Sequence, residues 1–366
     1  MMNLHVGSHL LPTLRMRPLC VAAFALTCLG PAPESVPPPM FLPGADLQIE
    51  RVYTWRETSA TTSAEILLDG EKTQDVPTVT SELKSEASLS VVDTFFRSDV
   101  NRPLHLRRMF EDIAYESSGN LRLDMGAGVA ELAISCDGDS ELDGAAVEFL
   151  WDDDSEAYVK KFAEDYDGDD DLLEGLDPDG DFIALLPVPD RDIEVGSSWK
   201  VEASALRRVL LPGGRLPMER ESDMDAVDGA FDPLVMPGVM ETLDGDASGG
   251  MSVRLVSAED GTMTLELLVE VEFVSDQAEA VGDMLGTVAP EDVDVELESA
   301  TYTSTLEGKG TLVWDTLNHF ARSFRLDLET GLDVQIAVHV EGMGIDAPFE
   351  LKEKREGTLR LDMERL

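Results

Sequence analysis

The chain contains little cysteine, histidine or lysine, and each shortage excludes a class of protein. Of 366 residues, three are cysteine and five are histidine, and only 8 of the 28 basic residues are lysine. Cys20 and Cys28 lie near the N-terminus and Cys136 stands alone further along, so no internal disulfide framework is available. The histidines are isolated, with no H-E-x-x-H motif and no paired cysteine, which argues against a zinc site.

Positive charge is the second shortage. There are 74 acidic residues against 28 basic ones, a formal net charge of −46. Nucleic acids and anionic membrane surfaces are excluded as partners, because binding them requires clustered lysine and arginine. Self-repulsion at this charge favours a monomer. Adaptation to a salty medium and a codon bias toward arginine both explain the composition.

Long apolar runs are also scarce, and the longest one is the core of a leader. The run at 19–29 (LCVAAFALTCL) follows Arg15 and Arg17 and is followed by Gly30, Pro31 and Ala32. This layout is typical of a secretory signal peptide, and the run is too short to span a bilayer. We therefore expect residues 1–32 to be removed and the mature chain, without a transmembrane helix, to be periplasmic or extracellular. Lipidation at Cys28 is the alternative, although Thr27 fits a lipoprotein signal poorly.

Beyond the leader, the sequence predicts a mainly β fold. Residues 33–45 are rich in proline and are expected to form an extended linker. Apolar and polar residues then alternate along several runs, which is typical of half-buried antiparallel strands. The apolar positions of three such runs are Met263, Leu265, Leu267, Val269, Val271 and Phe273; Val334, Ile336, Val338 and Val340; and Leu359, Leu361 and Met363.

The sequence also predicts turns, helices and a division into lobes. A hairpin is expected at 152–155 and a turn at 329–331, and short helices are expected at 204–211 and 276–285. In the run that starts at Leu47, Arg51 falls on the apolar side. A faint similarity between 142–152 and 306–315 is explained by two similar lobes, each a curved antiparallel sheet, and nearly as well by chance similarity between two β-hairpins. The lobes would span 46–190, with an acidic loop at 152–181, and 191–366.

The acidic loop offers a candidate calcium site. Alternate carboxylates at Asp177, Asp179 and Asp181 could converge on one hard cation. An EF-hand loop counted from Asp177 would need glycine at the sixth position and glutamate at the twelfth, where Phe182 and Val188 stand. Weak calcium binding is therefore the most that the sequence supports, and a solvated acidic loop explains the run equally well. No other cofactor is indicated.

A methionine-rich stretch is the candidate ligand site. Methionine side chains adapt to apolar ligands of variable shape, although they also fill gaps in ordinary cores. The residues proposed to bind a ligand are Met218, Leu234, Met236, Val239, Met240, Met284 and Leu285.

The sequence nominates no catalytic residue. A G-x-S-x-G nucleophile elbow is absent, and Gly308-Lys309-Gly310-Thr311 does not follow the Walker pattern. Glycosidase chemistry needs only two carboxylates, so 74 acidic residues neither exclude it nor identify a pair. Enzymatic activity stays open, and the sequence favours a protein without it.

Two segments carry a resemblance to other proteins. Leu186-Pro187 followed by Val195-Gly196-Ser197-Ser198-Trp199-Lys200, and Gly308, Gly310, Trp314 and Asp315 further on, match an LP…VGdsW pattern and a GxGxxxWD pattern. With these patterns the chain resembles uncharacterised exported bacterial β-sheet proteins. Sheets of that kind are in turn similar to the curved half-barrels of periplasmic lipoprotein carriers. The resemblance implies a structural role for the motif residues and an architecture, but no activity.

Together these observations predict an exported, non-enzymatic protein that binds or carries an apolar ligand, or an envelope partner, within a curved sheet. Two alternatives stay open: an acidic structural or interaction protein that acts through divalent cations, and a carbohydrate-active enzyme.

Overall fold

The computed structural model describes residues 35–72, 78–100, 102–124, 128–163, 166, 168–178, 182–188, 192–222, 238–288, 293–342 and 345–366. All of them belong to one compact unit, Ser35–Leu366. The predicted leader, including Cys28, lies outside the described residues. No helix in the described part of the chain is long and apolar enough to cross a membrane.

The unit is mainly β, as the alternating sequence pattern predicts. Six strands have 21 to 23 residues, which at about 3.3 Å per residue makes each roughly 70 Å long. The strands are β1 (Ser35–Val36), β2 (Leu47–Leu68), β3 (Glu71–Lys72), β4 (Thr78–Asp99), β5 (Arg102–Asp124), β6 (Val129–Asp139), β7 (Ala146–Asp152), β8 (Ala157–Phe162), β9 (Leu176–Asp177), β10 (Ile193–Glu194), β11 (Ser198–Val201), β12 (Gly213–Gly214), β13 (Glu219–Ser222), β14 (Asp246–Glu259), β15 (Thr262–Asp276), β16 (Val293–Asp315), β17 (Phe320–Gly342) and β18 (Ile345–Arg365).

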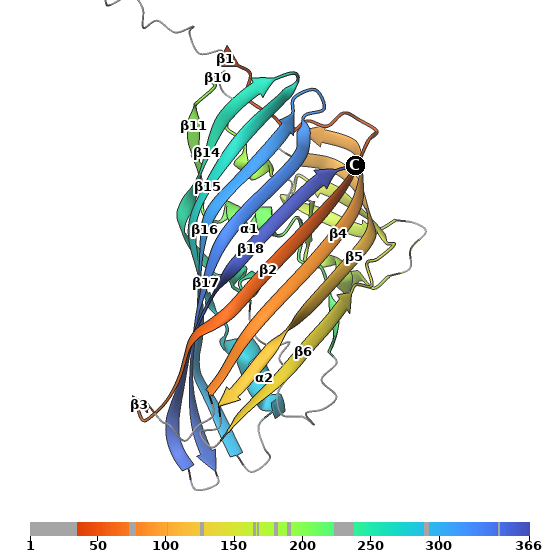
Figure 1. The fold of residues 1–366 in the computed structure, drawn as a ribbon. Helices are drawn as coiled ribbons and strands as arrows, with labels where there is room; N and C mark the ends of the chain where they lie inside the picture. Colours follow the sequence, from red (N-terminus) through yellow and green to blue (C-terminus); the bar gives the residue numbers. More distant parts are fainter. Residues whose placement is uncertain are drawn as a thin grey trace, which may run out of the picture. The chain divides into compact units, whose positions relative to one another are not determined.

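Among the described residues, fourteen strands form one antiparallel sheet. Its order is β11-β14-β15-β16-β17-β18-β2-β4-β5-β6-β13, with β3 paired to β2 and the β7–β8 hairpin paired to β5. Within this unit the long strands run side by side and the sheet curves around the helices (Figure 1). The hairpin turn predicted at 152–155 joins β7 to β8 as expected.

The two predicted lobes are joined rather than separated. Strands from 46–190 and from 191–366 share the one sheet, because β18 pairs with β2 from Phe349–Leu68 to Arg365–Arg51. A second junction forms where β13 pairs with β6. The boundary at residue 190 therefore does not divide two sheets. Sequence alternation identifies strands but not which strands pair, and pairing across the ends of the chain produced this arrangement.

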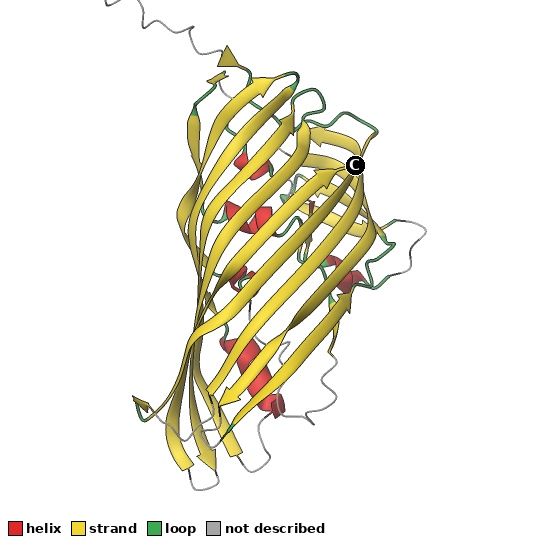
Figure 2. Cartoon of the chain, in the orientation of Figure 1, coloured by secondary structure: helices red, strands yellow, loops and turns green. Residues whose placement is uncertain are grey.

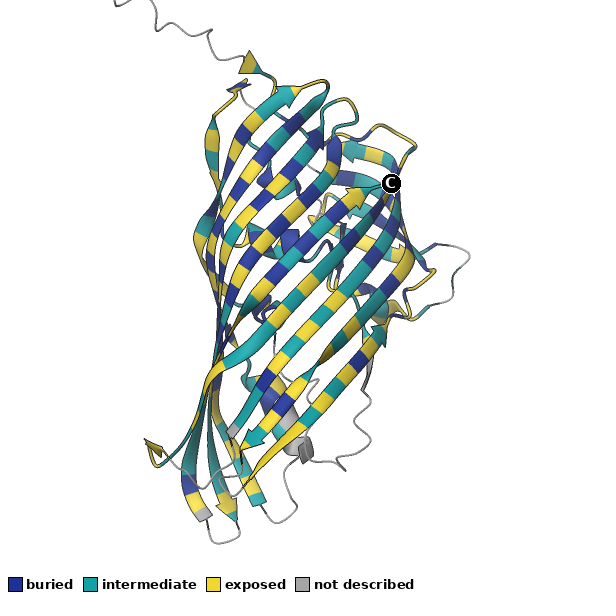
Figure 3. Cartoon of the chain, in the orientation of Figure 1, coloured by how far each residue is buried: buried dark blue, intermediate teal, exposed yellow. Residues whose placement is uncertain are grey.

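One face of the sheet is buried and the other is charged. Along β15 the six predicted apolar positions are all buried, and the intervening Glu266, Glu270 and Glu272 are exposed. This alternation is visible as bands along the strands (Figure 3). On the outer face, the Asp362 carboxylate accepts hydrogen bonds from Arg325 and Arg360 on β17 and β18. Water therefore covers the outer face, and the apolar contacts lie inside the curve.

The turn predicted at 329–331 is wrong, because β17 runs without interruption through these residues. Gly331 pairs with Thr305 on one side and Glu356 on the other. A Cβ atom at Gly331 would lie 2.7 Å from the Thr305 hydroxyl oxygen. The glycine serves close packing against β16, which a sequence pattern does not distinguish from a turn.

Short elements fill part of the inner face. Helices α1 (Ala205–Leu210) and α2 (Ala278–Val288) confirm both helical predictions, and 3₁₀ helices span Asp170–Leu173, Ile183–Leu185 and Met240–Asp244. The helices lie within the curve of the sheet (Figure 2). Leu206, Val209 and Leu210 of α1 join the main core, while Val281 of α2 packs with Tyr302 in a second, smaller cluster.

The proline-rich segment predicted as a linker contributes to the core. Phe41 is fully buried, and its ring lies 5.8 Å from the rings of both Phe95 and Phe320. Val36 of β1 pairs with Ile193 of β10. Proline content predicts an extended backbone, but it does not reveal whether an adjacent aromatic side chain finds a buried place.

The residues of the two resemblance motifs have structural roles. The indole nitrogen of Trp199 donates to the carbonyl oxygen of Leu185 at 3.0 Å, which ties the LP segment to β11. Trp314 is fully buried, and the Asp315 carboxylate accepts from the backbone nitrogens of Leu317 and Asn318 at 2.9 Å each. These contacts shape the turn between β16 and β17.

A buried ion cluster explains why Arg51 stands on the apolar side of β2. Its guanidinium donates to the Asp93 carboxylate and, at 2.5 Å, to the Tyr53 hydroxyl, and it lies 4.9 Å from the centre of the Phe320 ring. Arg108 donates to the same carboxylate through Nε and Nη2, at 2.8 and 2.9 Å. Side chains of all three charged residues are 2% exposed or less. The cluster fixes β2, β4 and β5 to one another inside the core.

Replacing Asp93 by asparagine should destabilise the fold strongly. Asp93→Asn leaves two buried guanidinium groups without their carboxylate, a change that costs about 3–5 kcal/mol in free energy of unfolding. Urea unfolding followed by circular dichroism measures it. The matched control is Glu86→Gln, since Glu86 is half exposed and pairs with Arg56 on the outer face; it should cost no more than about 1 kcal/mol. Equal losses for both variants would show that the buried cluster is not a stabilising element.

The same carboxylate should give a distinct pH dependence. Burial raises the pKa of Asp93, but the charges of Arg108 and Arg51 outweigh it and hold the pKa below its ordinary 3.8. The ionised Asp93 carboxylate therefore contributes its full stabilisation at pH values above its pKa in the unfolded chain, about 3.9. This contribution is lost as the pH falls through its lower pKa in the folded protein. We expect the difference in unfolding free energy between wild type and Asp93→Asn to be constant from pH 7 to about pH 4 and to shrink below it. A difference that grows on acidification would contradict this assignment.

Candidate functional site

A pocket lies on the inner face of the sheet, where β2, β4, β5 and β6 pass under the segment that follows α1. Its volume is about 270 Å³. The lining residues are Trp55, Glu57, Ser59, Leu83, Lys84, Ser85, Ala87, Ser88, Ile113, Ala114, Tyr115, Ser117, Ile134, Ser135, Cys136, Leu211, Pro212, Gly214, Leu216, Met218, Gly238, Met240, Arg355 and Leu359.

The strand register arranges the sheet side of the pocket in rows. One row crosses the sheet through Trp55, Ala87 and Tyr115. The next row, two residues along, crosses through Glu57, Ser85, Ser117 and Cys136. Because neighbouring strands lie about 4.8 Å apart, the second row spans roughly 14 Å. Residues from four strands therefore face one cavity, although they are far apart in the sequence.

The end of the pocket near Trp55 is apolar. The indole nitrogen of Trp55 donates to the carbonyl oxygen of Leu210 at 2.9 Å, which fixes the ring beneath the end of α1. Ile113 is 4% exposed and belongs to the main core, against which Met218 and Met240 also pack. This wall offers dispersion contacts and no charge.

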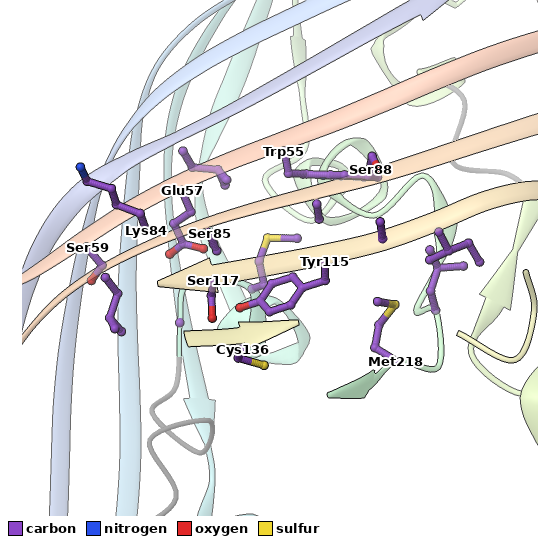
Figure 4. Close-up of a pocket in the computed structure, with 18 of the residues that line it drawn as sticks. Trp55, Glu57, Ser59, Lys84, Ser85, Ser88, Tyr115, Ser117, Cys136 and Met218 are labelled. Carbon is purple, nitrogen blue, oxygen red and sulfur yellow. The ribbon is translucent and has the colours of Figure 1, made fainter. Parts of the chain in front are cut away.

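The other end of the pocket is polar. Glu57 points toward Ser85, with Ser117 beside them (Figure 4). Arg355 also lines the pocket, and its guanidinium makes two hydrogen bonds of 2.8 Å to the Glu353 carboxylate. Thr61 donates to the same carboxylate at 2.8 Å. The buried Glu353–Arg355 pair is thus internally matched, as buried charges must be.

Cys136 lies at the far end of the polar row. Its side chain is buried, with 3% of the residue exposed, and its thiol lies 3.5 Å from the carbonyl oxygen of Asp137. Cys136 lines the pocket and forms no disulfide with another described residue. The described residues that line the pocket include no histidine.

The structure brings together two of the seven proposed ligand-binding residues. Met218 and Met240 line the pocket from the side opposite the sheet. Val239 is buried in the main core, and Leu285, which belongs to α2, packs against the second cluster. Met284 belongs to α2, and Leu234 and Met236 lie outside the described residues.

The proposed calcium ligands are only partly described. Asp177 is in β9 and pairs in register with Gly213 of β12. Asp179 and Asp181 lie outside the described residues. Within the described ranges, no group of three or more histidine, cysteine, aspartate or glutamate side chains could hold a metal ion. Weak calcium binding by the loop stays a prediction.

Sequence reasoning missed the sheet side of the pocket. Glu57, Ser85 and Ser117 lie at inward positions of strands that carry large apolar residues at other inward positions. Small or polar residues at inward positions indicate that no other part of the protein packs closely against them. That signal could be recognised only by knowing which strands are neighbours.

No family model matches the chain, and no curated protein matches it. Among solved structures, the chain is similar to an outer membrane channel from Pseudomonas putida F1, with 10% identity, coverage of 89% of this chain and 98% of that chain, and a TM-score of 0.21. It is also similar to OccK7 (OpdD) from Pseudomonas aeruginosa, with 6% identity, coverage of 87% and 99%, and a TM-score of 0.16. At TM-scores this low, neither similarity carries an argument about fold or function.

Cys136 provides a direct probe of the pocket. Because its side chain is buried, we expect iodoacetamide to modify it on the order of 100-fold more slowly in the native protein than in urea. Peptide mapping separates this residue from Cys20 and Cys28. Replacing Gly238, on the opposite wall, with tryptophan should slow the reaction further by filling the cavity. Native modification as fast as in urea would mean that the pocket is not closed around the thiol.

Proposed function

We propose that the protein is a non-enzymatic binding or carrier protein that holds an apolar small molecule in the pocket between β2, β4, β5 and β6 and the segment after α1. The observation that carries this proposal is a cavity of about 270 Å³ with an apolar wall, built from Trp55, Ile113, Met218 and Met240. Protein interiors are packed to the density of organic crystals, so a space of this size is not an ordinary packing defect.

The size of the cavity suits a small ligand. An engineered apolar cavity of about 150 Å³ binds benzene, and one water needs only about 10–15 Å³ of such space. The pocket is close to the lower end of the range of natural ligand sites, roughly 300–1,000 Å³. A ligand of about ten carbon atoms would make contacts on all sides.

The small side chains on the sheet side of the pocket support a ligand-binding role for the cavity. The main core carries large side chains such as Phe110 and Phe149, whereas the pocket rows carry Ser85, Ala87 and Ser117. These small side chains leave the space open. A ligand would complete the cover over β4 and β5.

Export is part of the proposal. It rests on the leader, in which Arg15 and Arg17 precede an apolar run and small residues follow it. The mature protein would bind its ligand in the periplasm or outside the cell, with lipidation at Cys28 as the alternative. The resemblance to half-barrel lipoprotein carriers agrees with this setting as an architectural analogy.

The test is binding of 1-aminoanthracene, an uncharged aromatic probe whose fluorescence rises in apolar surroundings. Wild-type protein should bind it with a one-to-one stoichiometry. Met218→Asp and Met240→Asp each place a carboxylate against the ligand and should weaken binding at least about tenfold.

The matched control is Leu268→Asp, because Leu268 is 52% exposed on β15 and lies away from the pocket. It adds the same charge and should leave the affinity unchanged. Absence of probe binding to the wild type, or equal weakening by Leu268→Asp, would refute the proposal.

A further inference from the structure

We infer that the ligand of the pocket is an uncharged amphiphile, a molecule with an apolar chain and a hydroxyl head, with the head held at Ser85 and Ser117. The inference rests on the proposed function and specifies the ligand class for the same site. It depends on three features of the pocket: charges of both signs at its polar end, serine hydroxyls that face the cavity, and the apolar wall beside them.

Charged side chains of both signs line the polar end of the pocket. They are Glu57 of β2, Lys84 of β4 and Arg355 of β18. A ligand amine would share the cavity with the two cations, and a ligand carboxylate would share it with Glu57. Like charges that are close together cost binding free energy, and an uncharged head avoids this cost for both signs.

These charges are also engaged or hydrated without a ligand. The Arg355 guanidinium makes two hydrogen bonds of 2.8 Å to the Glu353 carboxylate. Glu57 has an interaction partner within the chain, and Lys84 is exposed to solvent. A charged ligand head would therefore leave water without gaining a counter-ion, whereas a hydroxyl head needs only hydrogen bonds.

Serine hydroxyls can provide those hydrogen bonds. Ser85 of β4 and Ser117 of β5 are register partners, and both line the pocket. Figure 4 shows the two side chains beside each other. Among the described residues neither hydroxyl has a hydrogen-bond partner, so both are available to a ligand. A hydroxyl group both donates and accepts, so a ligand hydroxyl can donate to one serine and accept from the other.

The apolar chain of the ligand would lie toward Trp55. Trp55 and Ala87 are register partners in the row next to Ser85, and both line the pocket. Met218 and Met240 line it from the side opposite the sheet. A ligand with its hydroxyl at Ser85 would place its first carbons over Ala87, whose side chain is a single methyl group. The rest of the chain would lie between Trp55 and the methionines, where it gains dispersion contacts.

The experiment compares four ligands that share a ten-carbon chain: decanol, decylamine, decanoate and the zwitterionic decyldimethylglycine. Each is used at pH 7 and below its critical micelle concentration. Displacement of 1-aminoanthracene from the full chain is measured, with isothermal titration calorimetry as a second measurement. We expect decanol to bind about tenfold more tightly than each of the other three, because each of them must bury a charge.

Two serine variants locate the head group. The Ser85→Ala, Ser117→Ala double variant removes both hydroxyls and should lower the affinity for decanol about fivefold. Ser118→Ala is the matched control, because Ser118 follows Ser117 on β5 and its side chain is exposed on the opposite face. It should leave the affinity for decanol unchanged. The affinity of each variant for 1-aminoanthracene is measured first, so that displacement can be converted to affinity.

The outcomes separate this inference from the proposed function. If 1-aminoanthracene does not bind and none of the four compounds gives a calorimetric signal, the proposed function fails. If one of the three charged compounds binds as tightly as decanol or more tightly, the pocket binds apolar chains but the uncharged assignment is overturned. If the double serine variant binds decanol as tightly as Ser118→Ala does, the two hydroxyls do not hold the head and that part of the inference is wrong.

Discussion

The pairing of β18 with β2 is the constraint on which the rest of the structure depends. It joins the last strand of the chain to the first long one, from Phe349–Leu68 to Arg365–Arg51. Without it the strands β14–β17 and the strands β4–β6 would form two separate sheets with open edges. Contacts of such large separation in sequence carry a larger entropy cost of closure than local contacts do. The buried Arg51–Asp93–Arg108 cluster forms directly beside this junction.

The pocket follows from how the inner face of this sheet is covered. A curved sheet of long strands presents more inner surface than its short helices can cover. Residues of α1 belong to the main core cluster, and Val281 of α2 packs with Tyr302 of β16 in the second cluster. On β4 and β5 the register rows carry the small side chains of Ser85, Ala87 and Ser117, and a cavity is left there. The candidate site therefore lies where small side chains of the sheet meet the segment that follows α1.

Sequence patterns predicted the elements well where local chemistry decides them. The alternation from Met263 to Phe273 is a strand with one buried face, and both helices are where apolar spacing predicted them. Patterns failed where a residue has a long-range partner. The pattern predicts a turn at Gly331, which instead packs closely against β16, and Arg51 departs from the alternation because it pairs with the buried Asp93. Of the proposed ligand residues, Met218 and Met240 reach the pocket, while Glu57 and its neighbours were missed.

By itself the sequence determined the secondary structure, the one-sided burial of the strands and the negative charge, because each depends on residues close together or on a simple sum. It also excluded a disulfide framework, since one cysteine remains beyond the leader region. Only the tertiary structure decided that the two halves share one sheet and that Glu57, Ser85, Ser117 and Met218 face a common cavity. The physical reason is that backbone hydrogen bonds between strands are chemically alike, so pairing and register depend on packing of the whole chain.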